Sequence, residues 1–483
     1  MLFAARLAVL LALGFLTVGA VPAADARLLD AMRTAAGPVW RTHFVSISRI
    51  VANGETNVVS SEGEGVPFVL RRCSGELCDG TYFDGNRLFT LNANGTALPQ
   101  SDQPEPYLRS LRLIASLAFL APEFTSQGGK IDEGGTAQIN GKRYRQIFVV
   151  DPDAIPIRIL VDPKTSLIRY ARDLNGDDTF EYGDYRHVAG FTVPFLVMHN
   201  GTVLERYDDR TPVASAFHAP RGLVPVFKGP PQTIATDSAH ITPIFPCTLA
   251  GVAVRCLLDS GNSGISISSE LAAELDAPVV GTYAVRGLGG YSTQVVRTGP
   301  LQIANATYPE AYYVVLNDIR SYGYDVVLGA DVLASTAMQL DTGAHTIVLG
   351  TAPQTNSITI PLSFENFVPV VNVRLAGVDA KLAVDTGDES NINLAYDFYS
   401  KHPTLFTVTD RRSVTGVGGT SVELIGNIAQ VKLGDYTMGP QVIGTTKTLK
   451  GTAFGHLGAA FLEQFKVQID YTAGELHLVP LQP

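Results

Sequence analysis

An internal repeat in the second half of the chain limits the possible folds more than any other feature. Leu249-Ala250-Gly251-Val252 recurs as Leu375-Ala376-Gly377-Val378. Seven residues after each valine comes an acidic tripeptide, first Asp259-Ser260-Gly261 and then Asp385-Thr386-Gly387. Both pairs are 126 residues apart. Self-similarity of this kind indicates two copies of one structural unit packed together.

Three more matched segments follow in the same order, each pair 129 residues apart. They are Gly287-Leu288-Gly289-Gly290 with Gly416-Val417-Gly418-Gly419, Leu328–Leu333 with Leu457–Leu462, and Met338–Asp341 with Val467–Asp470. One three-residue insertion therefore relates the two copies. We predict one half at 241–350 and a second at 358–483, joined by a short polar linker at 351–357.

In each half, a predicted hairpin (248–258 and 372–384) leads apolar residues directly into the acidic tripeptide. The glycine that ends the tripeptide lets the backbone turn sharply and removes a side chain that would block a close neighbour. If the halves pack about a pseudo-two-fold axis, equivalent residues meet at that axis. The pattern therefore predicts that Asp259 and Asp385 lie side by side.

Two adjacent carboxylates cannot both ionise at low cost, so the pair would share one proton. The ionised acid can take a proton from a bound water while the protonated acid hydrogen-bonds a substrate carbonyl. Ser260 and Thr386 would hydrogen-bond across the pair of acids and hold the two loops in register. Gly261 follows Ser260 in the first loop, and Gly387 follows Thr386 in the second. The alternative is two unrelated Asp-Ser/Thr-Gly turns, which the shared repeat disfavours.

Three neighbouring positions need separate interpretation. A third Asp-Thr-Gly, at Asp341, aligns with Asp470-Tyr471 and is interpreted as a turn. Asn262 and the pair Asp388-Glu389 follow the two tripeptides, and extra carboxylates there would raise the pKa values of the pair by like-charge repulsion. His456 stands where an apolar residue is expected, and we interpret it as an exposed or core histidine rather than a catalytic one.

These motifs resemble the aspartic proteases, and most closely the retropepsin-like branch, with two halves fused in one chain as in the pepsin-like enzymes. The resemblance covers about 240 of the 483 residues. It implies a mainly β, bilobal double β-barrel in which Asp259 and Asp385 are catalytic. It also implies a peptide or protein substrate, no cofactor and no metal, and we expect a monomer. The two Gly-rich segments would be flaps that close over the substrate. Tyr291, beside the first flap, would be either a substrate contact or an exposed loop tyrosine. The glycines of the flaps are Gly287, Gly289, Gly290, Gly416, Gly418 and Gly419.

The first 26 residues have the pattern of a signal peptide. One Arg in Met1–Arg6 precedes an apolar stretch, 7–20, and Ala24-Asp25-Ala26 has the small-x-small pattern of a cleavage site. A transmembrane anchor is the alternative, but about 14 apolar residues fall short of the ~20 needed to span a bilayer. We expect an exported protein, periplasmic or secreted, without a membrane span after cleavage.

The four cysteines occur at short spacings, which suits an oxidising compartment. The expected disulfides are Cys73–Cys78 and Cys247–Cys256. A zinc site is disfavoured because no Cys-x-x-Cys motif occurs and the nine histidines are scattered.

Between the signal peptide and a Pro-rich linker at 221–240, we predict a β-rich domain at 27–220. Helices are expected at 27–36 and 107–121, and consecutive strands at 147–150, 157–161 and 167–172. Asp173–Asp178 reads as a hairpin turn rather than a calcium loop, since Asp178 stands where such loops need Gly. The segment 161–195 loosely resembles bacterial lipoprotein-carrier-like domains, which implies an antiparallel sheet and a groove for a lipid or peptide.

Composition excludes some classes of function. The net charge is −10, and no basic cluster is present, so nucleic acid is an unlikely partner. The 46 glycines and 28 prolines favour short strands and turns. A serine hydrolase is disfavoured because no Gly-x-Ser-x-Gly motif occurs. The leading hypothesis is an exported endopeptidase, and the alternative is a non-catalytic periplasmic binding protein built on the same scaffold.

Overall fold

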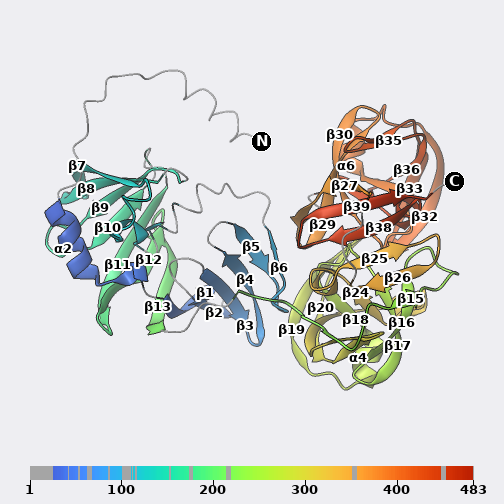
Figure 1. Cartoon of the computed structure of the whole chain (residues 1–483), viewed down its shortest axis with the longest axis horizontal. Coiled ribbons are helices and arrows are strands. Elements are labelled where there is room, and N and C mark those ends of the chain that lie inside the picture. Colours follow the sequence, from blue (N-terminus) through green and yellow to red (C-terminus); the bar gives the residue numbers. More distant parts are fainter. Residues whose placement is uncertain are drawn as a thin grey trace. The chain divides into compact units, whose positions relative to one another are not determined.

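The structure is a computed structural model that describes residues 26–41, 43–52, 55–62, 68–84, 87–99, 110, 113–114, 117–151, 154–172, 174, 178–213, 219–350, 356–447 and 453–481. It is mainly β, as predicted (Figure 1). The chain divides into two compact units, the first made of Met1–Leu70, Phe83–Asn86 and Gln103–Phe217, the second of Arg71–Tyr82, Arg87–Asp102 and His218–Pro483. Apart from Ala26, the predicted signal peptide lies outside the described residues.

The described residues of the first unit include the helix α2 (Ala26–Ala36) and an antiparallel sheet. Its strand order is β2-β1-β13-β12-β11-β10-β9-β8-β7, so most neighbours in the chain are neighbours in the sheet. The strands are β1 (His43–Ala52), β2 (Glu55–Glu62), β7 (Lys130–Ile139), β8 (Lys142–Val150), β9 (Ile157–Val161), β10 (Ile168–Arg172), β11 (Thr179–Val188), β12 (Phe191–His199) and β13 (Thr202–Val213). The predicted strands at 147–150 and 157–161 fall within β8 and β9, and the predicted strand at 167–172 agrees with β10 except at residue 167.

Helix α2 (Ala26–Ala36) agrees with the predicted helix at 27–36. Its buried residues, Leu28, Met32 and Ala36, recur every fourth position and so lie on one face. Leu28 and Met32 share a buried cluster with Ile147 and Ile159 of the sheet. Two short 3₁₀ turns, η1 (Val39–Arg41) and η2 (Ala118–Leu120), also lie among the described residues of this unit. Residues 107–109, 111–112 and 115–116 of the predicted helix at 107–121, and most of the turn at 173–178, lie outside the described residues.

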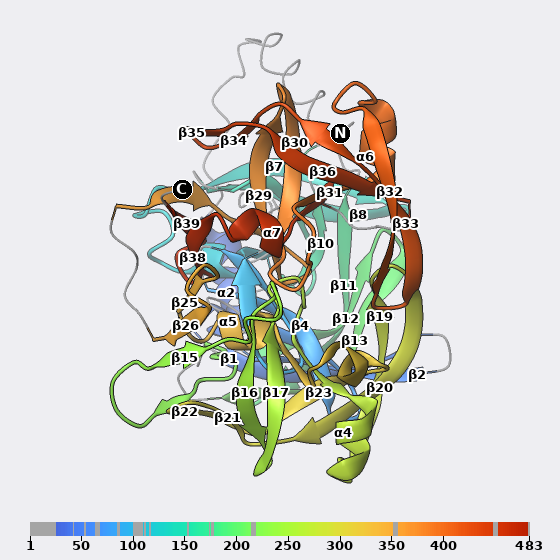
Figure 2. The same cartoon turned by 90° about the vertical axis from the view of Figure 1, so that its right-hand side faces the viewer.

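The second unit contains two large sheets with the same strand order. The first sheet runs β14-β22-β21-β16-β17-β24-β18-β23-β20-β19. The second runs β35-β34-β29-β30-β37-β31-β36-β33-β32, with β28 (Ser363–Glu365) added beside β29. Apart from β14 and β28, the two orders match strand for strand. Figure 2 shows the β16–β17 pair and its counterpart, the β29–β30 pair.

The bounds of these strands follow the predicted hairpins. In the first sheet they are β14 (Val226–Phe227), β16 (Ile244–Leu249), β17 (Val252–Leu258), β18 (Ile265–Ser268), β19 (Val279–Arg286), β20 (Gly290–Thr298), β21 (Leu301–Ile303), β22 (Ala306–Tyr308), β23 (Ala311–Leu316) and β24 (Val326–Leu328). In the second they are β29 (Val368–Leu375), β30 (Val378–Val384), β31 (Ile392–Ala395), β32 (Val408–Gly416), β33 (Gly419–Ile428), β34 (Val431–Leu433), β35 (Tyr436–Met438), β36 (Gln441–Thr446) and β37 (Gly455–Leu457).

A third sheet of six strands takes strands from both predicted halves, in the order β15-β26-β25-β38-β39-β27. Its centre is the β25–β38 pair, where Gln339 lies opposite Gln468. These two glutamines are equivalent positions of the sequence repeat. The strands are β15 (Thr233–Ala235), β25 (Met338–Asp341), β26 (Thr346–Leu349), β27 (Ile358–Pro361), β38 (Phe465–Asp470) and β39 (Glu475–Pro480).

Short helices cap the strands: α4 (Ser269–Glu274), η3 (Ile319–Tyr322), α5 (Ala330–Leu333), α6 (Tyr396–Lys401) and α7 (Ala459–Leu462). In the part of the chain that the structure describes, no helix has the length and apolar composition to cross a membrane.

The prediction of two β-barrels needs correction. Each large sheet has two free ends in the described strand order, β14 and β19 in the first and β35 and β32 in the second. The end strands β19 and β32 carry mostly half-buried or exposed side chains, because they form hairpins rather than a closed wall around the core. Each of the two large sheets is therefore open in the described strand order.

The boundaries of the second unit also differ from the sequence-based ones. Segments 71–82 and 87–102, which we predicted within the 27–220 domain, belong to it. They hold most of β3 (Phe68–Ser74) and β4 (Leu77–Phe83), and all of β5 (Leu88–Leu91) and β6 (Ala97–Pro99). The predicted linker at 221–240 supplies β14 and β15, which pair with β22 and β26. Ile234 anchors β15 because its side chain is buried.

Both predicted disulfides are present, Cys73–Cys78 and Cys247–Cys256. The first closes the turn between β3 and β4, and the second links β16 to β17. Disulfides of this kind persist in oxidising compartments.

Candidate active site

The Asp259 loop begins where β17 ends. Leu257 and Leu258 are buried in the core, and the next residue, Asp259, donates its backbone N–H to the carbonyl of Leu328 in β24 (2.9 Å). The N–H of Gly261 then donates to Asp259 Oδ1 (2.8 Å). The main chain therefore holds this carboxyl group in one orientation.

The Asp385 loop repeats this arrangement at the end of β30. Asp385 donates its N–H to the carbonyl of Leu457 in β37 (3.0 Å). Its Oδ1 accepts from the N–H groups of Gly387 (3.0 Å) and Asp388 (3.1 Å). The two carboxyl groups thus have closely similar backbone support.

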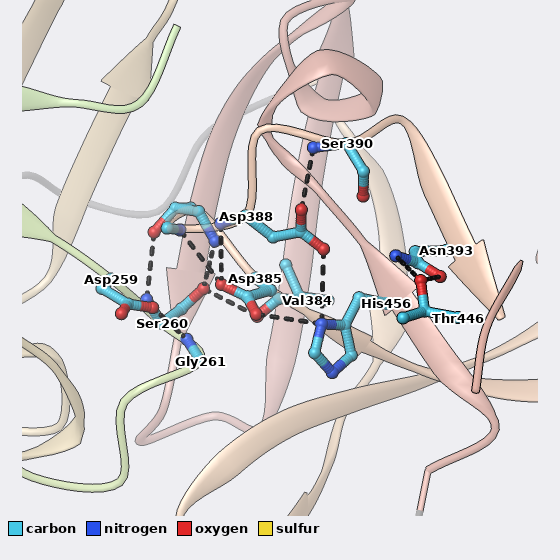
Figure 3. A network of polar contacts seen from close by, with 12 residues as sticks. Asp259, Ser260, Gly261, Val384, Asp385, Asp388, Ser390, Asn393, Thr446 and His456 are labelled. Carbon is cyan, nitrogen blue, oxygen red and sulfur yellow. Dashed lines mark hydrogen bonds and ion pairs between the residues drawn. The ribbon is translucent and has the colours of Figure 1, made fainter. Parts of the chain in front are cut away.

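Ser260 and Thr386 join the two loops through four hydrogen bonds. The N–H of Ser260 donates to Thr386 Oγ1 (3.0 Å), and the N–H of Thr386 donates to Ser260 Oγ (3.1 Å). Each hydroxyl also donates to the strand below the other loop, Ser260 to the carbonyl of Val384 (2.7 Å) and Thr386 to that of Leu258 (2.8 Å). Both side chains are almost fully buried, so the loops are locked against each other (Figure 3).

The two carboxyl groups lie at the junction of the loops. A Cβ atom on Gly261 would lie 2.5 Å from Asp385 Cγ, and one on Gly387 would lie 2.5 Å from Asp259 Cγ. Each carboxyl group therefore packs on the glycine of the opposite loop, which no other residue could replace without a clash. The carboxyl groups of Asp259 and Asp385 also interact electrostatically.

This proximity has an electrostatic consequence. Burial and the negative charge of Asp385 raise the pKa of Asp259 well above its usual value. A carboxyl group in this position keeps its proton into the pH range where an isolated aspartate has lost it. One site thus contains a proton donor next to a second carboxyl group.

His456 is a site residue that our reading of the sequence missed. It occupies the middle of β37, between Ala383 of β30 and Asn393 of β31. Its Nδ1 lies 3.1 Å from Asp385 Oδ2 and 3.4 Å from Asp388 Oδ2, and its side chain is 27% exposed. His456 is thus neither fully exposed nor remote from the carboxyl pair, a contact that the sequence did not predict. The 129-residue offset contained the signal, since it aligns His456 with Val327 in an otherwise apolar strand.

The contacts of His456 change its charge state. Burial lowers the pKa of His456, but the hydrogen bonds and negative charges of Asp385 and Asp388 outweigh it and raise the pKa to about 10. Burial likewise acts to raise the pKa of Asp388, yet the hydrogen bond and charge of His456 lower it overall. The like-charge repulsion that we expected Asp388 to exert on the carboxyl pair is therefore offset by the positive charge of His456.

The same three side chains could in principle hold a cation. Among the described residues, Asp385, Asp388 and His456 are the one group whose His, Cys, Asp or Glu donor atoms all lie within 4.8 Å of one another. However, Nδ1 lies at hydrogen-bonding distance from both carboxylates, so a single N–H satisfies the contact. We assign the group as an ion pair.

The two Gly-rich hairpins meet at their tips. The N–H of Gly289 donates to the carbonyl of Val417 (3.3 Å). A Cβ on Gly289 would lie 2.1 Å from the carbonyl oxygen of Gly418, so the backbones touch. Tyr291 is partly buried and packs with Val417 against a small core cluster. In Figure 2 the hairpins β19–β20 and β32–β33 approach each other.

The third Asp-Thr-Gly motif takes no part in this arrangement. Asp341 Oδ1 accepts from the N–H of Ala344 (2.9 Å) within the β25–β26 turn, and its Oδ2 pairs with Lys466 (3.0 Å). This agrees with its interpretation as a turn.

The first unit contains a separate apolar pocket, whose volume is about 1020 Å³ when the open space at its entrance is included. It lies between α2 and the sheet, and its lining is mostly apolar or aromatic: Met32, Leu120, Phe180, Tyr182, Val193 and Tyr207 among others. Glu205 and Arg210 are the charged residues of its wall.

Comparison with known families identifies part of the second unit. Residues 245–332 match the family model of an aspartyl protease. The match contains the Asp259 loop, β24 and α5, whereas the Asp385 loop lies outside it. A search of curated proteins finds no match to the chain. The second unit thus has an aspartyl protease-like region, which at the family level is a protease-type hydrolase.

Proposed function

We propose that this protein is an exported aspartic endopeptidase that hydrolyses peptide bonds with a water activated by Asp259 and Asp385. One observation carries the proposal: each of the two carboxyl groups packs on the glycine of the opposite loop, and Ser260 and Thr386 lock the loops together. The family match at 245–332 supports the first loop, and the equivalent backbone contacts of Asp385 support the second.

The proposed chemistry needs one proton in the pair before the reaction. The ionised acid takes a proton from the water as its oxygen attacks the substrate carbonyl carbon, and the protonated acid gives its proton to the carbonyl oxygen. Collapse of the tetrahedral intermediate breaks the C–N bond, and a proton passes from the pair to the leaving amine. No bond forms between protein and substrate.

The matching strand orders of the two large sheets support the proposal that the halves 241–350 and 358–483 are duplicated units of one double-lobed protease. Both acidic loops then come from a single chain, so a monomer suffices. The contact between Gly289 and Val417 suggests that the hairpins are flaps, which must separate to admit an extended peptide. The targeting segment predicted at 1–26 and the two disulfides support function outside the cytoplasm, in the periplasm or the medium.

The test is direct. The protein without residues 1–26 is incubated with an unfolded protein in water enriched in ¹⁸O, and the products are analysed by mass spectrometry. We expect internal cleavage, with ¹⁸O in the new carboxyl groups. Intact substrate over a pH range from 3 to 8 would contradict the proposal.

The pocket of the first unit favours a second candidate, a non-catalytic binding protein. Its apolar wall and its size suit an alkyl chain or an apolar peptide segment. A fluorescent fatty acid that binds stoichiometrically to a protein with no hydrolytic activity would favour this alternative. Binding together with hydrolysis would assign a ligand to the first unit and leave the protease proposal in place.

A further inference from the structure

The site is symmetric at its centre and asymmetric at its edge. The repeat aligns Asp388 with Asn262 and His456 with Val327. In the first half, the amide of Asn262 donates to Ser266 Oγ (3.2 Å) and so is occupied away from the carboxyl pair. The second half alone therefore places a histidine and a second carboxylate beside its catalytic candidate.

The two oxygens of Asp385 have different partners. Oδ1 accepts from the backbone of the loop, whereas Oδ2 faces Nδ1 of His456 (3.1 Å). Asp388 holds the imidazole from the other side through Oδ2 (3.4 Å), and its own Oδ1 accepts from the N–H of Ser390 (2.8 Å). Figure 3 shows His456 next to both carboxylates. The imidazole ring is thus held between two acids that the backbone has already oriented.

A cation near one member of a carboxyl pair favours the ionised form of that member. Asp259 has no such neighbour at its own loop, since Val327 occupies the equivalent of His456. The single proton of the pair should therefore reside on Asp259 and the negative charge on Asp385.

We propose that His456, held by Asp388, is a positioning residue that keeps Asp385 ionised and Asp259 protonated, so that Asp385 is the base for the attacking water. This inference rests on the proposed function and adds a division of roles to it. The water gives its proton to Asp385, and Asp259 gives its proton to the carbonyl oxygen. His456 keeps its own proton throughout.

The charged groups around His456 are few. Asp385 and Asp388 contact it directly, and Asp259 interacts with it through space. From β31, Asn393 is neutral, and its amide donates to Thr446 (3.1 Å). Farther away, Glu423 of β33 acts on Asp388 but is paired with Arg412 (2.5 Å). The charge of His456 is therefore balanced mainly by the two acids that it touches.

Two variants test the inference, each of which introduces the residue of the first half: His456→Val and Asp388→Asn. The readout is kcat/KM against pH, with an unfolded protein as substrate. In His456→Val, the carboxyl pair loses its neighbouring cation, so the acid limb should move to higher pH by about 1–3 units. In Asp388→Asn, His456 should lose its proton more readily, so the alkaline limb should move to lower pH.

Asn393→Ser is the matched control, because it alters the neighbour of His456 without a change in charge. Serine is also the residue of the first half at the equivalent position, Ser266, which pairs with Val327. Its profile should follow that of the wild type. Circular dichroism of all variants separates loss of fold from loss of charge. An active wild type with an unchanged acid limb in folded His456→Val would overturn the inference and leave the protease proposal standing, whereas an inactive wild type would overturn the proposed function itself.

A chelator provides the last arm. The wild type should keep full activity after treatment with EDTA, because the imidazole acts as a cation itself. Loss of activity with EDTA, restored by Zn²⁺ alone, would mean that the three side chains hold a metal, and would overturn the inference. A ¹⁵N NMR spectrum, in which the His456 signal is assigned by its absence from His456→Val, should show a doubly protonated ring at pH 7.

Discussion

The backbone N–H of Ser260 donates to the hydroxyl of Thr386, and the N–H of Thr386 donates to the hydroxyl of Ser260. This reciprocal pair requires an approximate two-fold axis between the loops. The β25–β38 pair has the same kind of symmetry, since Gln339 faces its repeat equivalent Gln468. A few buried hydrogen bonds thus fix the relative position of two carboxyl groups that are 126 residues apart in the chain.

Removal of a hydroxyl from this pair should destabilise the second unit. In Thr386→Ala, the N–H of Ser260 loses its acceptor and stays buried, which costs about 1–3 kcal/mol. Denaturant unfolding of wild type and variant measures the difference. Thr386→Ser keeps the hydroxyl and serves as the control. Equal stability of Thr386→Ala and wild type would show that these hydrogen bonds add nothing to the fold.

A side chain at the hairpin tips should separate them. In Gly289→Ala, the new Cβ would lie 2.1 Å from the carbonyl oxygen of Gly418, so the backbones must move apart. If the hairpins close over substrate, KM should rise about tenfold or more, with a smaller change in kcat.

Gly439→Ala is the control for the hairpin tips, because a Cβ there meets nothing within 4 Å. Steady-state kinetics on one peptide substrate compares the three proteins. An unchanged KM in Gly289→Ala would refute a role of the tips in substrate binding.

A buried carboxylate holds the 92–96 turn within the second unit. Asp331 is 1% exposed, and its carboxylate accepts from Asn92 Nδ2 (2.6 Å), Asn94 Nδ2 (2.6 Å) and Thr96 Oγ1 (2.5 Å). Asp331→Ala leaves three donors without this acceptor. Because each unsatisfied buried group costs about 1–3 kcal/mol, we expect the free energy of unfolding to fall by at least about 3 kcal/mol.

Asp435→Ala is the control for this experiment, since the Asp435 side chain is fully exposed. Thermal unfolding measures both variants. A Tm of Asp331→Ala equal to that of the wild type would contradict the importance of this attachment.

The raised pKa of Asp259 predicts a pH-dependent stability. Because the folded-state pKa lies above the unfolded one, the folded protein binds the proton more tightly, and stability is lost as the pH rises through the folded pKa. Asp259→Asn removes this loss. Its Tm should therefore exceed that of the wild type at pH 7, by about 2–4 °C for each kcal/mol recovered, and the gap should close below pH 4. A constant gap between pH 3 and pH 7 would contradict the shift.

Much of the site follows from local sequence. The hairpins, the two acidic loops and the short helices after Gly329 and Gly458 depend on turn glycines and apolar alternation, which are visible in the chain. The pairing of Ser260 with Thr386 was predictable because the repeat supplied the symmetry. Both disulfides were predictable from spacing alone.

The remainder depends on tertiary contacts. The attachment of Asn92, Asn94 and Thr96 to Asp331 joins residues more than 200 positions apart, and no periodicity encodes it. The prediction of closed β-barrels was wrong because closure of a sheet depends on which strands pair at its ends, and the number of strands does not determine this. The contacts of His456 could not be predicted, because a histidine in an apolar strand gives no sign of which side chains its ring will face.

The most direct test of the central claim compares three Asp→Asn variants of the same tripeptide pattern. Asp259→Asn and Asp385→Asn should each lower the hydrolysis of an unfolded protein by at least about 10²-fold, the contribution of a positioned acid or base, while the fold is retained. Asp341→Asn, in the Asp-Thr-Gly of the β25–β26 turn, should keep wild-type activity. Full activity in folded Asp259→Asn or folded Asp385→Asn would contradict the account.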